Sequence, residues 1–149
     1  MALKLDKNLK LIKELNPNSL ILLKMGSFYH AYGKDAYLLA YLFGYQVKTL
    51  DGSLSTCGFP VSALGKVERE LDDRKINHIQ ISRADNYAVE DDISYKSDNQ
   101  YSEYTDKAYK YILKKNKIDA FSEYLLENIN NDNFYEKMVR IEEILYGNV

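Results

Sequence analysis

The side chains best suited to bind a ligand lie in residues 24–36, which read KMGSFYHAYGKDA. Phe28, Tyr29, His30 and Tyr32 stand there between two glycines. An exposed ring on a turn or at a sheet edge offers a flat π face that can stack on a nucleic-acid base or wedge between two bases. Strand alternation puts Phe28, His30 and Tyr32 on one face and Tyr29 on the other. One face must be buried, and on composition alone the core is the commoner place for Phe28.

Residues that could support catalysis are few. His30 and His78 fall on different expected strands, without Cys, Asp or Glu neighbours at metal-ligand spacing, which favours structural roles for both. Cys57 is the single cysteine, and no neighbour would lower its thiol pKa, so we expect a buried, inert thiol. Neither a GxxxxGK[ST] loop nor a dinucleotide fingerprint occurs. We therefore expect no catalytic residue, no metal and no cofactor, and predict that the chain is not an enzyme.

Charge is distributed unevenly along the 149 residues, although the net charge is only −2. Residues 1–83 contain twelve basic and eight acidic side chains, whereas residues 84–95 contain four acidic and no basic ones. The mildly basic N-terminal part permits contact with phosphates. The basic side chains closest to the aromatic segment are Lys24, Lys34 and Lys48.

The composition is that of a globular protein, with 46% hydrophobic and 28% charged residues. A lone cysteine excludes an internal disulfide and favours the cytoplasm. The N-terminal MALKLDKNLKLIKEL lacks the apolar core of a signal peptide. No apolar run approaches the ~18 residues of a membrane span, so we expect no membrane partner.

Hydrophobic periodicity and turn residues predict a small mixed β-sheet flanked by helices, an α/β (α+β) fold. Pro17 and Gly44 are expected to end the first two helices, and Asp51-Gly52-Ser53 to form a hairpin turn. The expected helices are 5–15, 33–43 and 63–73, and the expected strands are 19–25, 28–32, 45–50, 54–59 and 76–82.

The rest of the chain is predicted to be mainly helical. Residues 84–99 are acidic and polar, typical of a linker or mobile loop. Three amphipathic helices are expected at 101–115, 118–130 and 133–146, with apolar stripes to bury against each other, the sheet or a second chain. The predicted organisation is a mixed α/β domain (1–83), an acidic linker (84–99) and a C-terminal helical segment (100–149).

Two blocks of this sequence carry a family resemblance. The run LILLKMGSFYHAYGKDAYLLAYLFGYQVKT resembles the N-terminal mismatch-recognition domain (domain I) of the DNA mismatch repair protein MutS. CGFP at 57–60, followed by VSALGKVERELDDRKINHIQIS, agrees with that family in order and spacing. The resemblance covers about residues 5–83. Met1 at the start and a helical end favour a complete, stand-alone relative.

The resemblance implies a mixed α/β domain that presents a Phe-x-Glu motif to the DNA minor groove. In that motif the Phe stacks on the mispaired base and the Glu hydrogen-bonds to it. Phe28 takes the place of the Phe, and His30 stands where the family has Glu. A carboxylate only accepts hydrogen bonds, whereas neutral imidazole has one donor and one acceptor, so His30 would contact a base differently.

Two functions follow from these features. The first is a module for mismatched or distorted double-stranded DNA, serving mismatch repair, with weak and salt-dependent binding through Phe28, His30, Lys24, Lys34 and Lys48. The second is an interaction or adaptor protein that kept the scaffold and lost specific mismatch recognition. In that case the C-terminal helices would form a homo-oligomer or bind a protein partner.

Overall fold

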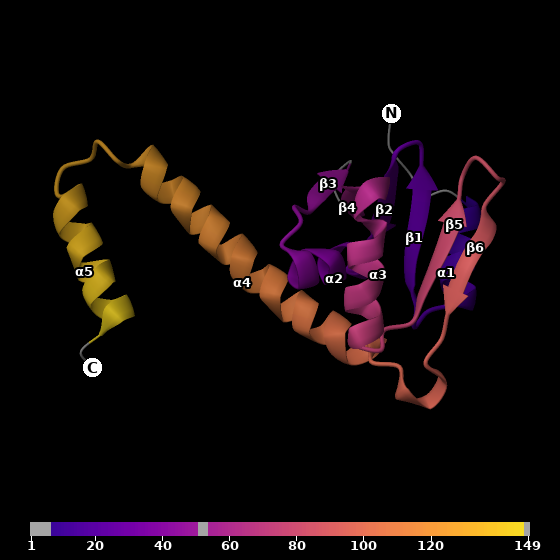
Figure 1. Ribbon diagram of the computed structural model, residues 1–149. Helices are drawn as coiled ribbons and strands as arrows, with labels where there is room; N and C mark the ends of the chain where they lie inside the picture. The colour runs from indigo at the N-terminus through magenta and orange to yellow at the C-terminus, as the bar shows by residue number, and fades with distance from the viewer. Residues whose placement is uncertain (1–6, 51–53, 148–149) are drawn as a thin grey trace. The chain divides into compact units, whose positions relative to one another are not determined.

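Six strands form one mixed sheet in the order β3-β4-β2-β1-β5-β6 in the computed structural model, which describes residues 7–50 and 54–147 (Figure 1). Strands β1 and β5 are parallel, and every other neighbouring pair is antiparallel. The predicted mixed sheet with flanking helices is therefore confirmed. The strands are β1 (Leu20–Met25), β2 (Phe28–Tyr32), β3 (Lys48–Leu50), β4 (Leu54–Pro60), β5 (His78–Ser82) and β6 (Ala88–Ile93).

Helices cover both faces of this sheet, which explains the unbroken apolar run in β1. On one face, Leu9 of α1 (Lys7–Leu15) packs against Ile21, Leu23 and Ile81. On the other face lie α2 (Lys34–Phe43) and α3 (Leu64–Asp73) (Figure 1). These helices bury their apolar side chains against Leu20, Leu22, Tyr29, Ala31, Cys57 and Phe59.

Turn residues act largely as the sequence predicts. Gly44 ends α2 in the left-handed conformation at φ 73°, and its N–H donates to the carbonyl of Ala40. A short 3-10 helix, η1 (Val61–Ala63), precedes α3, and a second, η2 (Lys96–Asp98), precedes the next long helix. The predicted helical residue Leu5 and the predicted Asp51-Gly52-Ser53 turn lie outside the described residues.

The prediction of a linker over residues 84–99 is wrong at its centre. Residues 88–93 form β6, which pairs antiparallel with β5 and extends the sheet. Its acidic composition resembles that of a loop, but charged side chains are common on an edge strand, where they discourage pairing with a foreign strand. Composition alone therefore concealed this strand.

The helical region also differs from its prediction. The expected helices at 101–115 and 118–130 form one continuous helix, α4 (Tyr101–Glu127), because no Gly or Pro interrupts the backbone between them. The third expected helix is confirmed as α5 (Phe134–Tyr146). By its contacts the chain divides into two units, residues 1–112 and 113–149. None of the described helices has the length and apolar character needed to cross a membrane.

Candidate nucleic-acid interface

Phe28 lies on the surface at the first position of β2. The turn before it is tight, because Met25 pairs directly with Phe28 and Gly26 adopts φ +62°, a conformation that glycine reaches without strain. Phe28 is 44% exposed, whereas the next residue, Tyr29, is 2% exposed. The predicted alternation of faces is thus confirmed, and Tyr29, not Phe28, is the core ring.

Tyr29 fixes the strand that carries Phe28. Its ring stacks on Phe59 of β4 with 5.6 Å between centroids, and Phe59 stacks in turn on Tyr45 at 5.9 Å. Stacked buried rings contribute beyond their area alone. Phe28 therefore projects from a backbone that is held in place from the other side of the sheet.

Three rings form a row along the face of β2 opposite Tyr29, called here the aromatic row: exposed Phe28, half-buried His30 and half-buried Tyr32, which packs against the cluster around Leu9 of α1. The His30 ring centroid lies 6.3 Å from that of Phe28 and 6.5 Å from that of Tyr32. Gly58 on β4 pairs with His30, and a Cβ there would lie 3.0 Å from His30 Nδ1. The glycine thus leaves the space in which the imidazole rests against the sheet.

The electrostatic state of His30 follows from its half-buried position. Burial lowers the pKa of the His30 imidazole, so the ring is neutral at pH 7. A neutral imidazole presents one donor and one acceptor. The aromatic row therefore offers a stacking ring and, beside it, a side chain that can both donate and accept a hydrogen bond.

The family sequence model of MutS domain I matches residues 5–87, more than half of the chain. The chain belongs to the MutS domain I family. This confirms the resemblance read from the two sequence blocks. No curated protein matches the chain.

The MutS domain I match ends at Tyr87, one residue before β6. Strands β1 to β5, helices α1 to α3 and the whole aromatic row therefore lie within the family's range. Strand β6, α4 and α5 lie beyond it.

The three lysines expected near the row of this MutS domain I chain occupy different places. Lys24 pairs with Tyr29 and so lies on the opposite face of the sheet from Phe28. Exposed Lys34 has its Nζ 5.6 Å from the centroid of the Tyr101 ring. Lys48 is exposed and pairs with Thr56, which also pairs with Tyr32, so Lys48 lies on the same face as Tyr32. This position is four residues, or ~13 Å, along the strands from Phe28. Only Lys48 shares the face of the aromatic row and is free to extend from it.

A basic side chain that sequence reasoning missed lies closer to Phe28. Arg83 follows β5, and its Nη1 donates to Met25 Sδ at 3.4 Å. Met25 is the direct strand partner of Phe28. Parallel pairing of β1 with β5 creates this proximity, and the sequence shows neither the pairing nor its register.

The other groups considered for chemistry are structural. His78 is buried, and its Nε2 lies 3.0 Å from Asp72 Oδ1. Cys57 is buried, as predicted, and burial raises the pKa of its thiol to about 11, which disfavours the reactive thiolate. Across residues 7–50 and 54–147, no three His, Cys, Asp or Glu side chains are grouped so that they could hold a metal ion.

A buried polar cluster, called here the Asp35 cluster, supports the sheet from the start of α2. Lys13 Nζ donates to Asp35 Oδ2 at 2.9 Å, Tyr101 OH donates to Oδ1 at 2.5 Å, and the Ile21 N–H donates to Oδ2 at 3.1 Å. Burial raises the pKa of the Asp35 carboxyl, and the Lys13 ammonium opposes that shift. The cluster joins α1, β1, α2 and α4, and no sequence pattern predicted it.

Proposed function

We propose that this chain is a DNA-binding module for mismatched or distorted duplexes, and not an enzyme. Phe28 acts as the stacking wedge and His30 as its polar neighbour. One observation carries the proposal: in a MutS domain I sheet, Phe28 is 44% exposed while the adjacent Tyr29 is buried. We further propose a role in DNA mismatch repair in the cytoplasm, where Cys57 would stay reduced.

Stacking explains why distorted DNA would be preferred. A wedge must first open a base step, and a mismatched or bulged step is already weakened, so less energy is lost in opening it. The gain from the ring is roughly 1–3 kcal/mol per base and depends little on sequence. Because β2 is fixed by Tyr29 and Phe59, little conformational entropy is lost when Phe28 inserts.

Phosphate contacts would come from the face of the aromatic row. Arg83 is exposed beside Met25, and Lys48 extends from the same face at the sheet edge. Two such contacts are few, so we propose weak binding whose log K falls by about 1.8 for each tenfold rise in salt concentration.

Arg83→Gln is expected to reduce the salt dependence of DNA binding, whereas Lys24→Gln is expected to leave it unchanged. Each lost phosphate contact lowers the slope of log K against log salt by about 0.9. Lys24 serves as the matched control because it lies on the opposite face of the sheet. Equal slopes for the two variants, measured by fluorescence anisotropy over a salt series, would contradict this placement of the duplex.

Affinity for DNA is expected to rise as the pH falls from about 7.5 to about 5.5, toward and below the ordinary His pKa of about 6.5. Burial lowers the pKa of His30 in the free protein, and nearby phosphates would raise it in the complex. Binding then takes up a proton, so lower pH favours the complex. His30→Gln should give a flatter profile, and a wild-type affinity that drops on acidification would exclude a protonated His30 in the complex.

The proposal is tested by titrating the chain with matched, mismatched, bulged and single-stranded DNA at two salt concentrations. The expected result is about tenfold tighter binding to the mismatched or bulged duplex than to the matched one, as one stacked base would give. Equal affinity for all four substrates, without a salt slope, would overturn the proposal. That result would favour the interaction or adaptor role instead.

A further inference from the structure

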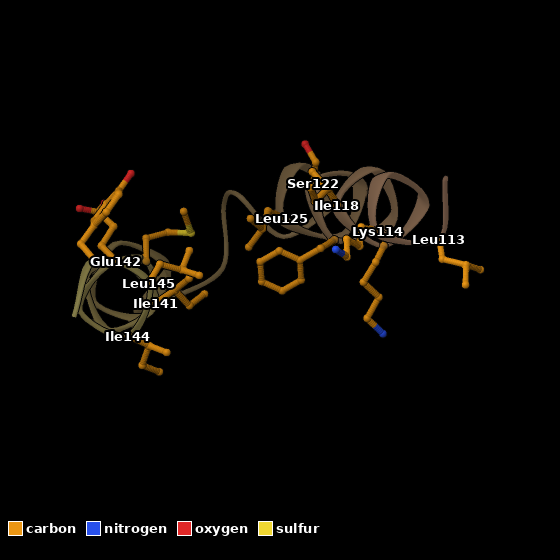
Figure 2. Close-up of a pocket in the computed structure, with 13 residues that line it drawn as sticks. Leu113, Lys114, Ile118, Ser122, Leu125, Ile141, Glu142, Ile144 and Leu145 are labelled. Carbon is orange, nitrogen blue, oxygen red and sulfur yellow. The ribbon is translucent and has the colours of Figure 1, made fainter. Parts of the chain in front are cut away.

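The second unit contains an apolar groove between its two helices. The C-terminal half of α4 and residues 138–146 of α5 line a groove of about 1150 Å³. Figure 2 shows Leu125 of α4 and Ile141 of α5 directed into the space between the helices. No residue among the described positions 113–147 is buried.

The apolar face of this helical hairpin must be buried by another surface for the hairpin to be stable in water. Short helices in water gain most of their stability from burying an apolar face, and here the face stays open. Six groove residues are between 45% and 81% exposed: Leu113, Ile118, Phe121, Ile144, Leu145 and Tyr146. At roughly 100–200 Å² each, they offer on the order of 800 Å². A standard protein interface buries about 800 Å² on each partner.

The charges at the groove indicate which partner fits. Lys114 and Lys117 line it from α4, and Glu142 lines it from α5 (Figure 2). None of these three side chains forms an ion pair with another residue in the described part of the chain. Two lysines on one helix and a glutamate on the other are self-complementary under a two-fold rotation that brings each α4 onto the partner's α5.

We propose that residues 113–146 dock on the same residues of a second copy and form a four-helix bundle. The two grooves close over each other and bury Ile141, Leu145 and Phe121 at the centre, where apolar side chains form the core of such bundles. Lys114 and Lys117 of one copy face Glu142 of the other. This dimer does not depend on DNA binding, and it places two MutS domain I units in one particle.

The dimer is tested by multi-angle light scattering and sedimentation of the full chain. The expected mass is twice the chain mass of 17.3 kDa. Replacing Ile141 and Leu145 together by Asp should give a monomer. Tyr135→Asp is the control, since Tyr135 is an 80% exposed apolar residue of α5 that does not line the groove. It should stay dimeric. A monomeric wild-type chain across the micromolar range would overturn the proposal.

Exchanging the charges of Lys117 and Glu142 distinguishes self-association of this chain from binding of a different protein. Lys117→Glu alone and Glu142→Lys alone should each weaken the dimer by about tenfold, because two-fold symmetry repeats each new like-charge contact. The double variant, with both charges exchanged, should return to near the wild-type dissociation constant. Single variants as tight as the wild type, or a double variant weaker than either single one, would overturn the proposed pairing of α4 with the partner's α5.

Discussion

Replacing Phe28 by Ala is expected to weaken binding to mismatched or bulged duplex by about tenfold, the equivalent of one lost base stack. The fold should tolerate the change, because the ring is 44% exposed and lies outside the buried clusters of the sheet. Affinity for matched duplex should change much less, since phosphate contacts dominate there. Fluorescence anisotropy on a matched and a mismatched duplex of otherwise identical sequence measures both effects.

Two further variants separate stacking from other causes. Phe28→Leu keeps an apolar side chain without a π face, so it should lose most of the mismatch preference. Val89→Ala on β6 removes another exposed apolar side chain, 57% exposed, and should bind as the wild type does. A folded Phe28→Ala protein with undiminished affinity for the mismatched duplex would rule out Phe28 as the wedge.

Local patterns predicted much of the first unit. The apolar run of β1, the alternation along β2 and Gly44 at the end of α2 each reflect constraints within a few residues, so the sequence reveals them. Strand β6 was missed because its pairing with β5, and not its own acidic residues, makes it a strand. The break expected inside α4 failed because a change in the apolar pattern does not by itself end a helix.

The candidate site likewise contains residues that the sequence reveals and residues that only the assembled sheet brings together. Phe28 and His30 were chosen because they occupy the Phe-x-Glu positions of the resembling family, whereas composition alone favoured the core for Phe28, which is 44% exposed. Lys24 was placed near them by chain distance, but the register of β1 on β2 puts it on the other face. Arg83 is 58 residues from Met25 in the chain, and Tyr101 is 66 from Asp35. Contacts of that separation depend on the assembled sheet, so neither was foreseen.

The Asp35 cluster should dominate the stability of the first unit. Asp35→Ala is expected to lower the free energy of unfolding by about 3–5 kcal/mol, the usual cost of breaking a buried ion pair from one side. The substitution leaves the Tyr101 hydroxyl and the Ile21 N–H without this acceptor, and leaves the Lys13 ammonium without its counter-ion, in a site where the Asp35 side chain is only 3% exposed. Urea unfolding followed by circular dichroism measures the change.

The chain provides a matched control for this prediction. Lys75 and Asp98 form a second Lys–Asp pair at 2.8 Å, with both side chains 56% exposed, so Asp98→Ala should unfold close to the wild type. If Asp35→Ala does not fold, Tyr101→Phe removes only the hydroxyl, which donates to Asp35 and accepts from Lys13, and should cost about 1–2 kcal/mol, a change small enough to measure. Equal stabilities for Asp35→Ala and Asp98→Ala would contradict a structural role for the cluster. A large difference would show that the sheet carrying Phe28 is held by a polar cluster on α1, α2 and α4, whose contacts span most of the first unit.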